Sequence, residues 1–147
     1  MHIDIGGVDM SRVQLALNVS NIDAAVEFYR RLFGAEPAKR RPGYANFAIA
    51  DPPLKLVLIE GAGEPGTLNH LGVEVASSGE VATEAVRLRR EGFDLVHEDG
   101  VTCCHALQDK FWVTGSDNRA WEVYTVLADA PQPSTEATSG CSSVPTP

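Results

Sequence analysis

The sequence lacks any long apolar run and carries few basic residues. No apolar stretch approaches the roughly 20 residues of a membrane-spanning helix, and the opening residues, "MHIDIGGVD", lack the basic segment and apolar core of a signal peptide. These absences favour a cytoplasmic protein and argue against a membrane partner. The chain has 12 Lys and Arg against 20 Asp and Glu, and this acidic balance argues against nucleic acid, which rewards clustered positive charge.

Cysteine is also scarce: the chain has three, without the regular spacing of a disulfide framework. In a cytoplasmic protein the thiols stay reduced and serve metal, metalloid or redox chemistry. Two of them, Cys103 and Cys104, are adjacent in "DGVTCCHALQDKFW", and a disulfide between neighbours would be strained. Two reduced thiols side by side can instead bind a soft centre such as trivalent arsenic or cadmium. The alternative is a pair of small buried apolar residues, but the flanking Asp99-Gly100 favours a loop.

Both ends of the chain are poor in the residues that build a core. Residues 1–10 are predicted to be a flexible N-terminal extension, in which Met10 is an alternative start to Met1. Residues 130–147 are rich in Pro, Ser and Thr and predict a disordered tail that contains Cys141. One folded domain is therefore expected over residues 11–129.

The middle of the chain contains the same unit twice. The first copy begins with "RVQLALNV", in which Leu15, Leu17 and Val19 alternate with polar or small residues and predict a strand. A helix is expected in "NIDAAVEFYRRLFG", with Asn21 or Asp23 as its cap and Ala25, Phe28, Tyr29, Leu32 and Phe33 at helical spacing. Three strands should follow, at residues 37–41, 44–49 and 54–60, separated by Pro42-Gly43 and Pro52-Pro53.

The second copy repeats this plan. It has a strand in "NHLGVEV", a helix in "SSGEVATEAVRLRREG" that should bury Val81, Ala85 and Leu88, and strands in "FDLVHED", "HALQDKFWV" and "AWEVYTVL". Each copy reads βαβββ, over about residues 11–61 and 67–129. The predicted fold class is α+β, in which two tandem modules form a cupped mixed sheet with helices on its outer face.

The polar faces of the predicted strands carry candidate metal ligands. Gln14 and His70 hold equivalent places in the two copies, and Glu122 lies on the last strand, in "RAWEVYTV". An amide oxygen, a neutral imidazole and a carboxylate suit a divalent ion of the Fe, Mn, Co, Ni or Zn group. Taken alone, Gln14 and Glu122 are better explained as ordinary polar residues of a half-exposed sheet, and His70 as a core histidine with its hydrogen bonds satisfied. Their matched places in a duplicated unit favour a common site.

The double βαβββ plan resembles the vicinal oxygen chelate superfamily of glyoxalases and dioxygenases. More narrowly, "RPGYANFAIADPPLKLVLIEG", "NHLGVEV", "TCCHALQDKFWVTG" and "WEVY" are similar to the ArsI-type C–As lyases and the cadmium-induced CadI family, over about residues 10–128. The resemblance implies a non-haem Fe(II) dioxygenase that uses dioxygen to cleave the carbon–arsenic bond of trivalent organoarsenicals, such as methylarsonite and reduced aromatic arsenicals. It also implies that Gln14, His70 and Glu122 hold the iron, while Cys103 and Cys104 bind the arsenic on a mobile loop.

The sequence departs from the pattern of such oxygenases in two places. Gln14 stands where a facial triad usually has a histidine, so the metal could also be Mn, Co, Ni or Zn. His105 stands where similar sequences have tyrosine, and its role stays open, as does that of Cys141. Whether two chains pair into a homodimer, and whether methyl or aromatic arsenicals are preferred, also stays open.

Two alternative functions remain. A cadmium- or arsenite-binding resistance protein without turnover would need the cysteines but no working iron site. A glyoxalase or thiol transferase of the same fold would normally draw a second carboxylate ligand from the first copy. The corresponding strand, "LKLVLIEG", has only apolar residues at its middle, which disfavours this reading.

Overall fold

The computed structural model describes residues 11–103 and 106–129. These residues form two compact units. The first is Arg12–Leu71, and the second begins at Gly72 and includes Ser11. Within the described part of the chain, no helix has the length and apolar character that crossing a membrane requires.

Several predictions fall outside the described residues. They are the N-terminal extension at 1–10, the disordered tail at 130–147 with Cys141, and the roles given to Cys104 and His105. The proposed domain boundaries likewise stay a prediction.

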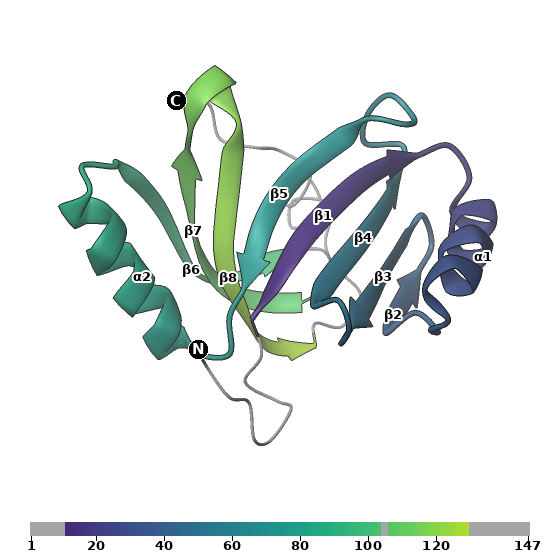
Figure 1. Cartoon of the computed structure of the whole chain (residues 1–147), viewed down its shortest axis with the longest axis horizontal. Helices are drawn as coiled ribbons and strands as arrows, with labels where there is room; N and C mark the ends of the chain where they lie inside the picture. The colour runs from purple at the N-terminus through teal and green to yellow at the C-terminus, as the bar shows by residue number, and fades with distance from the viewer. Residues whose placement is uncertain (1–10, 104–105, 130–147) are drawn as a thin grey trace. The chain divides into compact units, whose positions relative to one another are not determined.

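The first unit follows the predicted βαβββ order (Figure 1). Its elements are β1 (Arg12–Val19), α1 (Ile22–Phe33), β2 (Lys39–Arg41), β3 (Tyr44–Ile49) and β4 (Leu54–Glu60). The strands lie in the order β2-β3-β4-β1, and the first residues of β5 (Leu68–Glu74) lie beside β1. β1 runs parallel to β4, whereas β3 is antiparallel to both β2 and β4. The three strands predicted after the helix are confirmed.

Helix α1 begins and ends on residues that the sequence marks. The side chain of Asn21 accepts a hydrogen bond from the backbone N–H of Ala24 at 3.0 Å, which makes Asn21 the N-cap. Gly34 closes the helix with a φ of 62°, in the left-handed region where a side chain is unfavourable. The helix between these two caps covers β3 and β4 (Figure 1).

The core of the first unit lies between α1 and the sheet. Of the apolar face predicted for α1, Ala25, Tyr29 and Phe33 pack against this core, whereas Phe28 and Leu32 are exposed. Ile22 and Val26, which were not predicted, are buried. The sheet contributes the buried residues Ala45, Phe47, Ile49, Leu56 and Leu58, and the partly buried Leu15, Leu17 and Val19 pack against them as predicted.

The second unit repeats the order with the second half of β5, α2 (Ser78–Arg90), β6 (Leu95–Cys103), β7 (Ala106–Thr114) and β8 (Ala120–Asp129). A short 3₁₀ turn at Ser116–Asn118 precedes β8. The strands lie in the order β5-β8-β7-β6, and the pairs of β7 with β6 and β8 are antiparallel. The predicted α+β class with two βαβββ modules is confirmed.

Helix α2 covers β7 and β8 (Figure 1). Its N-cap is Ser77, whose hydroxyl accepts a hydrogen bond from the backbone N–H of Glu80 at 3.2 Å. Val81 and Ala85 are buried and Leu88 is partly buried against the same core, as the helical spacing predicts.

The loop predicted for the Cys103-Cys104 pair is not tested, because Cys104 lies outside the described residues. The strand predicted to end at Asp99 continues as β6 through Gly100 to Cys103, so Asp99-Gly100 does not end it. The break is instead a β-bulge, where the pairing with β7 shifts between Glu98 and Val101. Gly100 adopts a φ of 63°, and its backbone N–H donates to Oδ1 of Asp109 at 2.7 Å. Glycine therefore marks an irregular strand here, not the end of one.

Candidate functional site

The structure brings Gln14 and His70 together. Gln14 lies on β1 and His70 on β5, both within the first unit, and their Nε2 atoms are 3.1 Å apart. Both side chains are buried, with 4% and 2% of their surface exposed. The two residues that the repeat aligns are therefore neighbours in a polar, water-poor position.

The separation of these two side chains fits a pair of ligands on one metal ion. Two ligand atoms that are each about 2.1 Å from an ion, at a right angle, lie about 3 Å apart. Among the described residues, no three His, Cys, Asp or Glu side chains form a metal-binding group. Among the described side chains, a site at His70 would therefore draw on a donor of another type, such as the Gln14 amide oxygen.

The second ring nitrogen of His70 also has a partner. Nδ1 lies 2.8 Å from Oδ1 of Asn69. Both nitrogens of the ring are thus engaged by side chains, and the ring plane is held between Gln14 and Asn69. Such support from a neighbouring carbonyl or carboxylate oxygen is usual for a metal-binding histidine.

Glu122 lies on β8 in the second unit and is buried. Nζ of Lys110, on β7, donates to its Oε1 at 3.0 Å, and the two side chains are only 1% and 5% exposed. The ammonium group also lies 5.6 Å from the ring centre of Trp112, within the range of a cation–π interaction. The carboxylate that was predicted as a metal ligand is therefore held by a buried cation.

One face of β7 carries a row of buried polar or amphipathic side chains. Gln108, Lys110 and Trp112 alternate with residues of the opposite face, where Phe111 belongs to the apolar core. Nε1 of Trp112 donates to Oε1 of Glu98 at 3.2 Å. Among the described residues, Oε1 of Gln108 is a buried oxygen without a hydrogen-bond partner. Such an orphaned acceptor is costly, and a bound ligand could satisfy it.

Of the predicted thiol pair, Cys103 is the last residue of β6 and pairs with Ala106 at the start of β7. Cys104 and His105 follow Cys103 in the sequence and lie outside the described residues. Cys103, Gln108 and Glu122 all belong to the second unit. It stays a prediction that Glu122 and the two thiols share one site with Gln14 and His70.

Sequence patterns alone did not single out Lys110, Asn18 or Asn69. For Lys110 a signal was present, because a lysine at an inward position of an alternating strand needs a buried partner. The alternation of the first strand does place Asn18 on the same polar face as Gln14, but it gives no sign of the contact between Asn18 and Asn69, which joins segments far apart in the chain.

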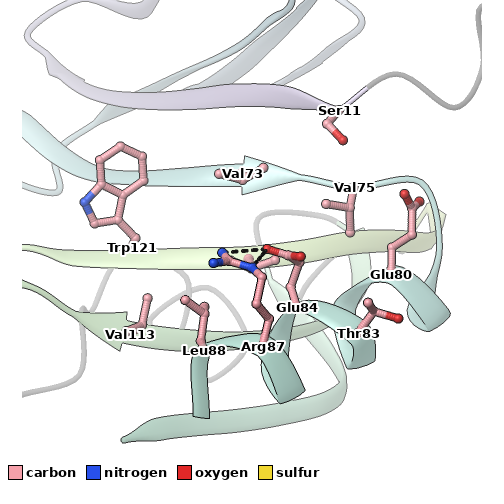
Figure 2. Close-up of a pocket in the computed structure, with 11 residues that line it drawn as sticks. Ser11, Val73, Val75, Glu80, Thr83, Glu84, Arg87, Leu88, Val113 and Trp121 are labelled. Atoms are coloured by element: carbon pink, nitrogen blue, oxygen red, sulfur yellow. Dashed lines mark hydrogen bonds and ion pairs between the residues drawn. The ribbon is translucent and has the colours of Figure 1, made fainter. Parts of the chain in front are cut away.

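A separate hollow of about 440 Å³ lies in the second unit, between α2 and the sheet (Figure 2). Trp121 and Val123 of β8 line it, and they flank Glu122 in sequence. Because neighbouring residues of a strand point to opposite faces, the hollow lies on the other side of β8 from Glu122. On its rim, a hydrogen bond to Glu84 raises the pKa of the Arg87 guanidinium above its ordinary value. Of the predicted site residues whose side chains are described, Gln14, His70 and Glu122 do not line this hollow.

Comparison with protein families matches residues 11–123 to the model described as "Glyoxalase/Bleomycin resistance protein/Dioxygenase superfamily". The chain is 67% identical over 121 residues to the cadmium-induced protein CadI of Mycobacterium tuberculosis, which covers 82% of this chain and 80% of CadI. It is 61% identical over 122 residues to a trivalent organoarsenical cleaving enzyme of Thermomonospora curvata, which covers 82% of this chain and 81% of that enzyme.

Among solved structures, the chain is similar to the Mn(II)-bound glyoxalase from Novosphingobium aromaticivorans. The TM-score is 0.55 at 18% sequence identity, and the match covers 85% of this chain and 43% of the glyoxalase. This likeness supports the fold that the two βαβββ modules describe.

Proposed function

Because the chain belongs to the Glyoxalase/Bleomycin resistance protein/Dioxygenase superfamily, and within it to the group that includes CadI and trivalent organoarsenical cleaving enzymes, we propose that it cleaves carbon–arsenic bonds. The substrates are trivalent organoarsenicals such as methylarsonite and reduced aromatic arsenicals. The observation that carries the proposal is the 61% identity to the Thermomonospora curvata enzyme. The structural observation that supports it is the buried pair of Gln14 and His70.

In this proposal Gln14, His70 and Glu122 hold a divalent iron ion, which supplies the means of activating dioxygen when it is bound. Gln14 would contribute its amide oxygen, so its amide must turn from the orientation in which Nε2 faces His70. Glu122 supplies the negative charge, and Lys110 holds its carboxylate in place before the metal binds.

The thiols of Cys103 and Cys104 are proposed to bind the arsenic. Trivalent arsenic exchanges its two hydroxyl groups for two thiolates, releases two waters and keeps its carbon substituent. The thiols must be reduced for this exchange, which is consistent with a cytoplasmic location. Holding the arsenic on the protein turns a collision into a positioned encounter.

The overall conversion balances with dioxygen alone. Methylarsonite, CH₃As(OH)₂, and one O₂ contain the atoms of arsenite, As(OH)₃, and formaldehyde. Arsenic stays trivalent, while the carbon loses the four electrons that dioxygen takes up. No further reductant is needed for this stoichiometry.

The test is to incubate the reduced, iron-loaded protein with methylarsonite in air and to measure arsenite by chromatography coupled to mass spectrometry. The Thermomonospora curvata enzyme serves as the positive control, and the same mixture under argon as the negative one. The proposal expects arsenite in air only. If the control enzyme forms arsenite and this protein forms none, the proposal is wrong.

A second candidate function is the binding of cadmium or arsenite without turnover, and the 67% identity to CadI favours it. It requires the thiols but no iron at Gln14, His70 and Glu122. Tight binding of Cd(II) together with the absence of arsenite formation would support this candidate.

A further inference from the structure

The polar side chains around His70 form a hydrogen-bond chain that begins at a backbone carbonyl. The hydroxyl oxygen of Thr67 lies 2.5 Å from the carbonyl oxygen of Glu64. A carbonyl oxygen can only accept, so Thr67 donates its single hydroxyl proton to Glu64. The direction of every later bond in the chain follows from this first one.

The next two members of the chain are Asn18 and Asn69. Nδ2 of Asn18 lies 2.9 Å from Oγ1 of Thr67, and because the Thr67 proton is already used, Asn18 must donate here. Its Oδ1 is then the atom that faces Asn69, and it accepts from Nδ2 of Asn69 at 2.9 Å. The opposite orientation of the Asn18 amide would set two acceptors against each other at Thr67. Both amide orientations are therefore fixed by chemistry.

The chain ends on the imidazole. With its Nδ2 directed at Asn18, Asn69 presents Oδ1 to Nδ1 of His70 at 2.8 Å. This oxygen can only accept, so the neutral ring carries its proton on Nδ1. Nε2 is left with its lone pair, and this is the atom that faces Nε2 of Gln14 at 3.1 Å.

Two backbone hydrogen bonds hold Asn18 where its side chain can reach both Thr67 and Asn69. Its N–H donates to the carbonyl of Thr67 at 2.9 Å, and its own carbonyl accepts from the N–H of Gly66 at 2.9 Å. Gly63 leaves just enough room for the amide, because a Cβ at Gly63 would lie 2.7 Å from Nδ2 of Asn18. The segment between β4 and β5 is thus shaped around this side chain.

We propose that Asn18 and Asn69 are positioning residues that hold His70 in the Nδ1-protonated tautomer, so that Nε2 is presented to a divalent cation. The proposal rests on the proposed function only in taking His70 as a metal ligand. Asn69 acts by direct contact with the ring. Asn18 acts indirectly, because it fixes the orientation of the Asn69 amide. Loss of such support typically lowers metal affinity by about 10- to 100-fold.

The first experiment measures the tautomer of His70 in the metal-free protein by ¹⁵N NMR of the imidazole, at about pH 8, where an unperturbed histidine is neutral. The His70 signals are assigned by their loss in His70→Ala. The expected spectrum has a protonated Nδ1 and an unprotonated Nε2. In Asn18→Ala the Asn69 amide is released, so the Nε2-protonated tautomer should become populated.

Asn46→Ala is the matched control. Asn46 is as buried as Asn18, each being 6% exposed, and it lies in the same unit. Its Nδ2 donates to Oη of Tyr44, which does not belong to the series of hydrogen bonds that ends at His70. This variant should keep the wild-type tautomer. A change in both variants would attribute the effect to general loss of packing and would overturn the proposal.

Three further variants keep the test decisive if Asn18→Ala folds poorly. Gly63→Ala removes no polar atom but pushes on the Asn18 amide, and it should also populate the second tautomer. Asn69→Asp keeps an oxygen acceptor for Nδ1 and should retain the wild-type tautomer, whereas Asn69→Ala should not.

The second readout is the affinity for Co(II) alone, from its visible absorption. Asn69→Ala should bind about 10- to 100-fold more weakly than wild type, with recovery in Asn69→Asp and no change in Asn46→Ala. An Nε2-protonated His70 in the wild type, or an unchanged tautomer in Asn18→Ala, would overturn the inference. Both readouts are independent of arsenite formation, so a failure of the proposed function leaves them interpretable.

Discussion

Lys110 and Glu122 form an ion pair inside the second unit, with Nζ and Oε1 3.0 Å apart and both side chains almost fully buried. Removing two charges from water is costly, and their attraction offsets that cost only while both partners are present. A metal ion at Glu122 would supply a second positive charge beside the same carboxylate. In the proposed function, the stability of the metal-free protein and its affinity for metal would therefore be linked through Lys110.

Replacing Lys110 by Met should leave the Glu122 carboxylate buried without its cation. We expect the free energy of unfolding to fall by about 3 kcal/mol, measured by urea denaturation in the presence of a chelator. Adding Mn(II) should restore part of this loss, because the ion replaces the missing positive charge. The double variant Lys110→Met with Glu122→Gln should be more stable than Lys110→Met alone.

The matched control for this prediction is an ion pair at the surface. Arg30 pairs with Glu27 in α1, and both side chains are largely exposed. Arg30→Met should cause no measurable loss, because exposed pairs contribute little. If Arg30→Met lowered the free energy of unfolding as much as Lys110→Met, the claim that burial makes the loss of a partner costly would be wrong.

Glu122→Gln should separate turnover from arsenic binding. The amide keeps the shape of the side chain but removes the charge proposed to hold iron, so arsenite formation should fall by at least about 100-fold. Binding of phenylarsine oxide, measured by quenching of tryptophan fluorescence, should persist. Cys103→Ser should abolish this binding, whereas Cys141→Ser should leave it unchanged. If Glu122→Gln lost as much phenylarsine oxide binding as Cys103→Ser, the separation between a metal-holding Glu122 and an arsenic-binding Cys103 would be wrong.

Gly100→Ala should disturb the bulge that precedes Cys103. The φ of 63° at Gly100 is unfavourable for a residue with a side chain, at about 1–2 kcal/mol. We expect lower stability in urea denaturation and weaker arsenical binding. Gly79→Ala is the control of opposite sign, because Gly79 lies in α2 and an added Cβ would meet only Oγ of Ser77 at 3.6 Å. That variant should be as stable as the wild type or more so.

Gln108→Met should test whether the buried oxygen of Gln108 serves a ligand. The substitution keeps the approximate volume and removes an acceptor that has no partner among the described residues, so the free energy of unfolding should rise by about 1 kcal/mol. Turnover of methylarsonite should nevertheless fall if the oxygen contacts the bound substrate. Lower stability in the ligand-free variant would show that Oε1 already has a structural partner.

The strand boundaries of the first unit could be predicted because breaks stand between them. Pro42-Gly43 and Pro52-Pro53 interrupt the apolar alternation, and the observed strands end at these breaks. The same reasoning failed at Asp99-Gly100, since a glycine with positive φ can also bend a strand without ending it. Local sequence does not distinguish a turn from a bulge, because the partner strand decides between them.

Side-chain partners were harder to predict than elements. The apolar stripe of α1 is wide, and only packing against the sheet decides that Val26 faces inward while Phe28 does not. The repeat correctly made Gln14 and His70 equivalent, and they are neighbours in the structure. The support from Asn69 and Asn18 could not be predicted, because it depends on contacts made only in the folded chain.

The central claim is that one divalent ion is held jointly by Gln14, His70 and Glu122. The most direct measurement is equilibrium dialysis against Fe(II) under argon, with metal analysis of the wild type and of the three single alanine variants. The account predicts one ion per chain in the wild type and a weaker affinity, by at least about tenfold, in each variant. Wild-type affinity and stoichiometry in Glu122→Ala would contradict it.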